Sequence, residues 1–182
     1  HFLAELKNYQ ADLQLVVAFK MLPEVVWNMP PLGTVNLHAS LLPDYRGAAP
    51  INWAVMNGEE YSGVTTFLLK HEIDTGNLIF QERVEITPDM SAGELHDKLM
   101  YTGADLLVKT VNAMADGNYP LLDQDHLLAG REPKSAPKIF KEDMKVDWTA
   151  NMDTIYNHIR GLSPFPTAWT ELKNNKNGEV VS

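Results

Sequence analysis

The stretch that decides the fold covers residues 34–50 and reads TVNLHASLLPDYRGAAP. Its first five residues have the alternation of a β-strand, so that Asn36 and His38 point to the same face of a sheet. A loop follows, and Pro50 is suited to the first turn of a helix. Open α/β sheets bind their ligands just beyond the carboxyl ends of their strands. An amide and an imidazole at this place therefore predict a functional site.

Each of these two residues also has a structural interpretation. A lone histidine in an apolar stretch more often belongs to the core, and a lone asparagine in a strand more often marks a turn or an edge. Here the two residues occur together at strand spacing, and a long loop rather than a hairpin follows them. This combination favours a binding or catalytic site.

The flanking segments predict an α/β fold with a Rossmann-like, mostly parallel sheet. The first apolar run, residues 13–19, is typical of a buried parallel strand. The last strand, residues 78–86, has one polar face, which is typical of an antiparallel strand. Ser91 and Glu94 form a capping box ahead of a long helix that ends at Gly117. The expected strands cover residues 13–19, 34–38, 63–70 and 78–86. The expected helices cover residues 1–9, 23–28, 50–57, 91–117 and 151–161, the last with Ile155 and Ile159 pointing inward.

Helical and strand periodicity is lost after residue 123, which predicts a boundary between domains. We expect a catalytic domain over residues 1–123, a linker over 124–138 and the start of a β-rich domain over 139–182, with a turn at 174–178. The basic residues of the linker read as solvated charges. The chain begins without Met inside a helix and stops inside a hairpin, so we expect it to be part of a longer protein.

Composition limits the classes of function. The chain has 182 residues, a net charge of −9 and no cysteine. The charge argues against a nucleic-acid surface spread over the whole chain, so a basic face is expected to be local or to lie elsewhere. There is no apolar run of membrane-spanning length and no secretory signal. We expect a cytoplasmic protein without disulfides, metal or membrane contacts, acting as a monomer.

Several short motifs resemble the formyltransferase family that uses 10-formyltetrahydrofolate, and the likeness extends over nearly the whole chain. The motifs are Asn36-Leu37-His38, Ser40-Leu41-Leu42-Pro43, Tyr45-Arg46-Gly47 and Asp74-Thr75-Gly76. The resemblance implies the formyltransferase fold, followed by a β-barrel domain of the OB type. It also implies 10-formyltetrahydrofolate as the formyl donor.

The resemblance further implies a catalytic trio of Asn36, His38 and Asp74, although Asp74 on its own would read as a turn residue. An amide and an imidazolium are suitable donors to a tetrahedral oxyanion, and a carboxylate can carry protons. The residues implied for the folate site are Ser40, Leu41, Leu42 and Pro43, together with the backbone of Lys20, Met21 and Leu22. Tyr45 and Arg46 are candidate tRNA contacts, or alternatively a pair that stabilises the loop.

The implied formyl acceptor is the α-amine of methionine carried by initiator tRNA. Three alternatives remain: an enzyme acting on a nucleotide-linked amino-sugar, a folate-dependent hydrolase that releases formate, and a non-catalytic module that binds folate or RNA. The Ala48-Ala49 pair and the segment 136–139 favour the tRNA acceptor over the amino-sugar. An intact trio argues against a module that only binds.

Overall fold

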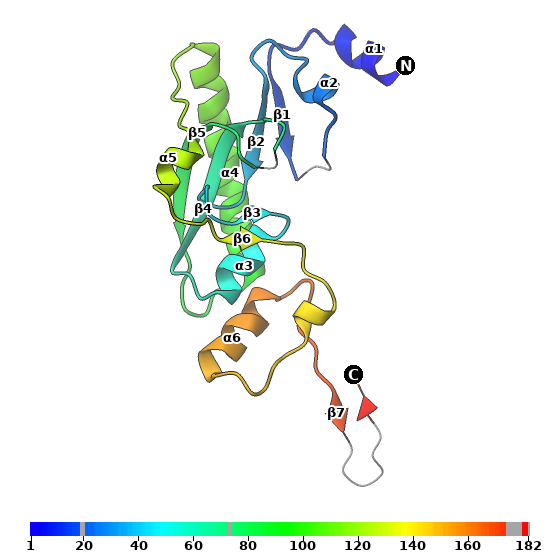
Figure 1. Ribbon diagram of the computed structural model, residues 1–182, viewed down its shortest axis with the longest axis vertical. Coiled ribbons are helices and arrows are strands. Elements are labelled where there is room, and N and C mark those ends of the chain that lie inside the picture. Colours follow the sequence, from blue (N-terminus) through cyan, green and yellow to red (C-terminus); the bar gives the residue numbers. More distant parts are fainter. Residues whose placement is uncertain (19–20, 73, 174–179, 182) are drawn as a thin grey trace.

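The computed structural model describes residues 1–18, 21–72, 74–173 and 180–181. The chain folds around a four-stranded sheet with the order β1-β2-β4-β5 (Figure 1). These strands are β1 (Gln14–Val17), β2 (Thr34–His38), β4 (Tyr61–Leu68) and β5 (Leu78–Glu85). The α/β fold class predicted from the sequence is confirmed, and β2 has the predicted bounds.

The described sheet is mixed in strand direction. β1 and β2 are parallel, whereas the pairs β2-β4 and β4-β5 are antiparallel. The loop between β4 and β5 is too short for the crossover that parallel neighbours need, which explains why β5 runs antiparallel, as its polar face predicts. Among these four strands the parallel, Rossmann-like part is thus limited to β1 and β2.

Six α-helices, one 3₁₀ helix and four short strands accompany this sheet in the described part of the chain. The helices are α1 (Phe2–Asn8), α2 (Glu24–Trp27), α3 (Pro50–Met56), α4 (Ala92–Ala115), α5 (Gln124–Leu128), the 3₁₀ helix η1 (Glu142–Met144) and α6 (Met152–Gly161). The short strands are β3 (Arg46–Gly47), β6 (Ser135–Ala136), β7 (Leu172–Lys173) and β8 (Val180–Val181).

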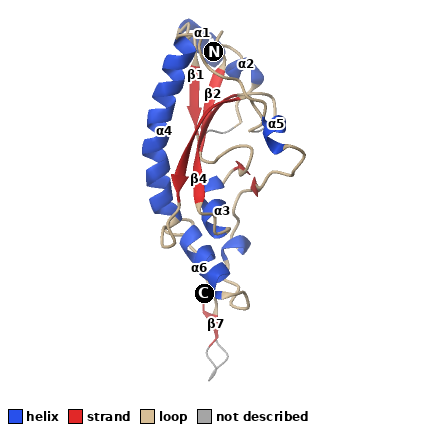
Figure 2. Ribbon diagram, turned by 90° about the vertical axis from the view of Figure 1, so that its left-hand side faces the viewer, coloured by secondary structure: helices blue, strands red, loops and turns tan. Residues whose placement is uncertain are grey.

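Helix α4 covers one face of the sheet (Figure 2). Ser91 and Glu94 form the predicted capping box at its start. Its Gly103 lies against Leu37 so closely that a Cβ atom there would come within 2.7 Å of the leucine Cδ2. Leu37 therefore faces α4. Because side chains alternate along β2, Asn36 and His38 point to the opposite face.

Strand β1 is less buried than its apolar sequence predicts. Leu15 and Val17 are 42% and 54% exposed. Within the described residues β1 pairs with β2 alone, so one of its edges has no neighbouring strand, and the prediction of a buried strand is wrong there. Phe19, which ends the predicted run, lies outside the described residues.

The connecting segment, residues 124–138, is largely exposed but contains more regular structure than its composition predicts. It contains α5 and β6, and β6 pairs in parallel with β3. The Arg131 guanidinium binds both carboxylate oxygens of Asp44 at 2.7 Å, and Lys134 forms an ion pair with Glu59. These partners lie about 75 to 90 positions earlier in the chain, so local composition could not reveal them.

The C-terminal part begins with α6, which packs on α3. Ile159 on α6 is 41% exposed rather than inward-facing, because the contact with α3 is made through the end of the helix around Gly161. Beyond it, β7 and β8 pair antiparallel, and the turn predicted at 174–178 lies outside the described residues. None of the helices described is long and apolar enough to cross a membrane.

Candidate active site

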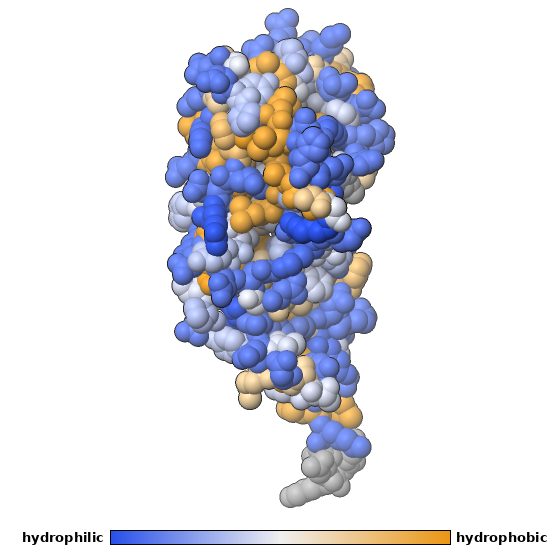
Figure 3. All heavy atoms as spheres, turned by 60° about the vertical axis from the view of Figure 1, so that its left-hand side comes forward, coloured by the Kyte–Doolittle hydropathy of each residue, from blue (hydrophilic) through white to orange (hydrophobic). Residues whose placement is uncertain are grey.

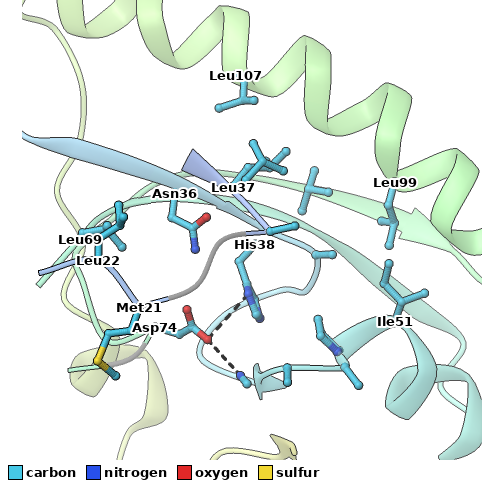
Figure 4. Close-up of a pocket in the computed structure, with 18 of the residues that line it drawn as sticks. Met21, Leu22, Asn36, Leu37, His38, Ile51, Leu69, Asp74, Leu99 and Leu107 are labelled. Carbon is cyan, nitrogen blue, oxygen red and sulfur yellow. Dashed lines mark hydrogen bonds and ion pairs between the residues drawn. The ribbon is translucent and has the colours of Figure 1, made fainter. Parts of the chain in front are cut away.

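A cavity of about 860 Å³ lies at the carboxyl ends of β1 and β2 (Figure 4). Asn36, His38 and Asp74 line it together, as the sequence predicts for these three side chains. Leu99 and Leu107 of α4 contribute an apolar wall. Figure 3 shows apolar side chains, in orange, gathered on the surface in the upper half of the view, away from the C-terminal end of the chain. Both the volume and the mainly apolar lining with few polar groups are typical of small-molecule sites.

The ring of His38 is held from behind by the backbone. Its Nε2 lies 2.8 Å from the carbonyl oxygen of Tyr45, and a carbonyl can only accept, so Nε2 carries a proton and donates it. Nδ1 therefore faces the cavity, 3.8 Å from Oδ2 of Asp74. This distance is longer than a hydrogen bond, and catalytic pairs commonly shorten when substrate binds.

Asp74 is fixed by the loop between β4 and β5 and by the loop after β2. Its φ of +54° places it in the left-handed region, which is strained for most residues but which Asp tolerates better than most. Its Oδ2 accepts a hydrogen bond of 3.0 Å from the Gly47 amide. Gly47 has a φ of +124°, and a Cβ atom there would come within 2.5 Å of the Ala136 carbonyl oxygen, so this approach requires glycine.

The side-chain amide of Asn36 lines the cavity. Its side chain is buried, yet Oδ1 has no hydrogen-bond partner among the described residues. Figure 4 shows the amide directed toward the same space as the His38 ring and the Asp74 carboxylate. A buried polar group without a partner costs free energy, and such groups in a cavity indicate a function.

The predicted folate residues divide into two groups. Met21 and Leu22 line the cavity, whereas Lys20 lies outside the described residues. Leu69, Lys70, His71 and Glu72 also line it, although sequence reasoning did not assign them.

The segment Ser40–Pro43 is not among the residues that line this cavity, and its assignment to the folate site stays a prediction. Its polar groups are bound internally: Thr65 Oγ1 donates to the Ser40 carbonyl at 2.6 Å, and Gln81 donates to the Leu42 carbonyl at 2.8 Å. Leu42 packs with Phe67 and Leu78 in the core. The motif shapes the loop beneath the site.

Tyr45 and Arg46 are also engaged within the protein, which favours the loop-stabilising interpretation over a tRNA contact. The buried Tyr45 hydroxyl donates to Glu59 at 2.5 Å, and burial together with this bond raises the pKa of the phenol well above its ordinary range. The guanidinium of Arg46 donates to Gln124 at 3.0 and 2.6 Å. Neither side chain is free to reach a large partner.

Gln124 is a further residue near the site that the sequence did not indicate, and Gly47 was noted only as part of the Tyr45-Arg46-Gly47 motif. Gln124 is 1% exposed and touches the Asp74 loop. The one signal in the sequence was a Gly directly after the Tyr-Arg pair, since glycine in a loop often marks a close approach of backbone. Among the described side chains no group of three or more His, Cys, Asp or Glu residues is placed to hold a metal ion.

The sequence matches a family model described as formyl transferase over residues 1–111, and one described as formyl transferase, C-terminal domain, over residues 138–180. The first match alone covers more than half of the chain. The chain therefore belongs to the formyl transferase family.

Within this family the chain is similar to a methionyl-tRNA formyltransferase from Azobacteroides pseudotrichonymphae, with 59% identity over 172 residues, or 94% of this chain and 53% of the relative. The chain spans about half the length of the curated relatives it matches.

Two solved structures share the fold. A likely sugar N-formyltransferase from Mycobacterium tuberculosis superposes with a TM-score of 0.78 at 24% identity, covering 98% of this chain and 75% of that chain. HypX from Aquifex aeolicus, in complex with tetrahydrofolic acid, gives 0.77 at 22% identity, covering 94% and 29%. At these identities the likeness concerns the fold alone.

Proposed function

We propose that this chain is part of an enzyme that transfers a formyl group from 10-formyltetrahydrofolate to the α-amine of methionine on initiator tRNA. The observation that carries the proposal is the convergence of Asn36, His38 and Asp74 on one cavity. The similarity to methionyl-tRNA formyltransferases, at 53–60% identity in several relatives, supports the tRNA as acceptor.

The first chemical requirement is to stabilise the formyl oxygen when the amine attacks. Attack converts the planar formyl carbon into a tetrahedral centre whose oxygen carries negative charge. The Asn36 amide donates to this oxygen, and a protonated His38 donates from Nδ1, the nitrogen that is not bound to Tyr45. Donors that are already in place cost no reorganisation during the reaction.

The second requirement is to move protons. The attacking ammonium must lose one proton before it bonds to carbon and a second from the tetrahedral intermediate. This second proton is transferred to N10 of the folate as the bond between N10 and carbon breaks. Asp74, whose Oδ2 lies 3.8 Å from Nδ1 of His38, accepts the first proton of the amine. Transfer of the formyl group then leaves one amide and one secondary amine, so no covalent enzyme intermediate is needed.

The folate donor is placed by apolar groups at the rim of the cavity. Met21, Leu22 and Leu69 supply the surface on which the flat ring system packs. Exposed backbone in the segment 70–72 pairs with the polar edge of the ring. In this proposal the enzyme acts as a monomer in the cytoplasm, where initiator tRNA is used.

The acceptor is tested by offering the full-length protein both methionyl initiator tRNA and a nucleotide-linked amino-sugar, with 10-formyltetrahydrofolate in excess. Mass spectrometry of the products should find formyl-methionine after hydrolysis of the tRNA and no formylated sugar. Formylated sugar without formyl-methionine would overturn the choice of acceptor. Release of formate without either product would overturn the transfer reaction itself.

A further inference from the structure

Gln124 lies outside the catalytic trio but is bound directly to the loop that carries Asp74. Its Nε2 donates two hydrogen bonds of 2.8 Å, one to the carbonyl oxygen of Asp74 and one to that of Gly76. Its Oε1 accepts the two bonds from Arg46. The amide of Gln124 therefore uses both of its donor hydrogens and its acceptor inside the protein.

The position of Gln124 is itself well determined. Two residues earlier, Leu122 exchanges backbone hydrogen bonds of 2.8 and 2.9 Å with Leu78, at the start of β5. Asp123 caps the first turn of α5, in which Gln124 is the first residue. The side chain thus extends from an anchored backbone into a buried position, where it is 1% exposed.

The Asp74 loop needs such support. Asp74 has a left-handed backbone, and the structure gives its carboxylate one hydrogen bond, from Gly47. His71 and Glu72, in the same loop, are exposed. A residue with a strained backbone keeps its conformation only when the surrounding groups fix it. Gln124 fixes the carbonyl of Asp74 and that of the residue two positions later.

We propose that Gln124 is a positioning residue that holds the Asp74 carboxylate at its place beside Nδ1 of His38. This inference rests on the proposed function, in which Asp74 assists proton transfer. Gln124 lies between the two family-matched regions, so the proposal gives the connecting segment a direct part in the geometry of the site. A displacement of about 1 Å is enough to reduce turnover about a hundredfold.

Three variants of the full-length protein separate positioning from stability. Gln124→Met keeps the size of the side chain and removes all four hydrogen bonds. Gln124→Glu retains an acceptor for Arg46 but loses both donors to the loop. Gln81→Met is the matched control, because Gln81 also donates two bonds to other groups, the Leu42 carbonyl and Thr65, without touching Asp74.

We expect kcat to fall about tenfold to a hundredfold in both Gln124 variants, with KM for the folate donor changed less than about twofold. Gln81→Met should lower the melting temperature while leaving kcat within about threefold of the wild type. In an Asp74→Asn background, Gln124→Met should cause no further loss of kcat. The effects of two substitutions are not additive when one residue acts through the other. An equal further loss in that background would overturn the proposal.

A second measurement does not depend on activity. The ring-nitrogen resonances of His38, recorded by NMR on histidine labelled with ¹⁵N and assigned with His38→Gln, report what lies beside Nδ1. Gln124→Met should shift the Nδ1 resonance in the same direction as Asp74→Asn, and Gln81→Met should leave it unchanged. A protein that formylates neither acceptor but shows this pattern would refute the proposed function and still support the positioning role. An unshifted resonance in Gln124→Met would overturn the positioning role whatever the activity.

Discussion

The residues of the site differ in how strongly the protein holds them. His38 is bound through Nε2 to the Tyr45 carbonyl, and Asp74 is bound through both its carboxylate and its carbonyl. The Asn36 oxygen, by contrast, has no partner in the described structure. The trio thus combines two residues fixed by the loops with one whose side-chain oxygen has no partner among the described residues.

Asn36→Ala tests the role of this amide in the full-length enzyme. Loss of one oxyanion donor should lower kcat about a hundredfold, with the affinity for folate little changed. The measurement is steady-state formylation of methionyl-tRNA, together with folate binding by calorimetry. Because Asn36 makes no hydrogen bond through Oδ1 within the protein, the melting temperature should not fall. A turnover near wild type, or a loss confined to folate binding, would show that Asn36 is structural.

At this scale, the sequence predicted the positions of residues that project from a regular strand or match a motif. It did not predict residues whose role depends on partners far away in the chain. Asn36 and His38 share a face because strand alternation is a local property. Gln124 could not be found in this way, because its partners Asp74 and Gly76 lie about 50 positions away. Ser40 and Leu42 matched a motif, but the motif does not tell whether a side chain faces a ligand or the core.

At the scale of elements, ion pairs and charged hydrogen bonds hold the connecting segment against the rest of the protein. Although partial burial opposes it, the hydrogen bonds from Arg131 and from the Lys134 amide hold the pKa of Asp44 below its ordinary value of 3.8. A carboxylate whose pKa is lower in the folded state stabilises the fold at pH values above its unfolded pKa. That contribution is lost as the pH falls through the folded pKa, which means below about pH 4.

Asp44→Asn should therefore lower the melting temperature by a few degrees at pH 7, and the difference from the wild type should close between about pH 4 and pH 2. Thermal unfolding monitored by circular dichroism over this range measures it. Asp105→Asn, at an exposed carboxylate on α4, is the control and should show little difference at any pH. A difference for Asp44→Asn that stays constant down to pH 2 would contradict this account.

Element boundaries were predictable where local signals set them, as at the capping box of α4 and the glycine after α3. The burial of β1 was not predictable, because it depends on which strands lie beside it. The same holds for β3 and β6, which are two residues each and exist only because they pair with each other.

For the molecule as a whole, the contact between α3 and α6 joins the part that holds the cavity to the segment that follows the connecting segment. Gly161 lies so close to Met56 that a Cβ atom there would come within 2.8 Å of the Met56 backbone nitrogen. The Asn52 side chain donates to the Gly161 carbonyl at 2.8 Å. The two helices can therefore approach only because residue 161 has no side chain.

Gly161→Ala should force α6 away from α3 and cost roughly 1–3 kcal/mol of unfolding free energy, the usual effect of overpacking. Urea denaturation measures the loss, and limited proteolysis should show faster cleavage near residue 161. Met152→Ala, at a residue of α6 that is 78% exposed, is the control and should be nearly neutral. Equal stability of the two variants would mean that the helices do not pack this tightly in solution.

The pairing of β3 with β6 bears on how genes of this family can recombine. A crossover between two diverged parents within residues 112–123 would combine the Asp74 loop and Gly47 of one lineage with the Gln124 and Ala136 of another. Each half of such a recombinant protein is intact, but the residues that contact one another across the two halves come from different parents and do not fit. With the positioning role proposed for Gln124, the part that must be inherited together extends through the connecting segment. Evolution is then expected to exchange the C-terminal part only beyond it.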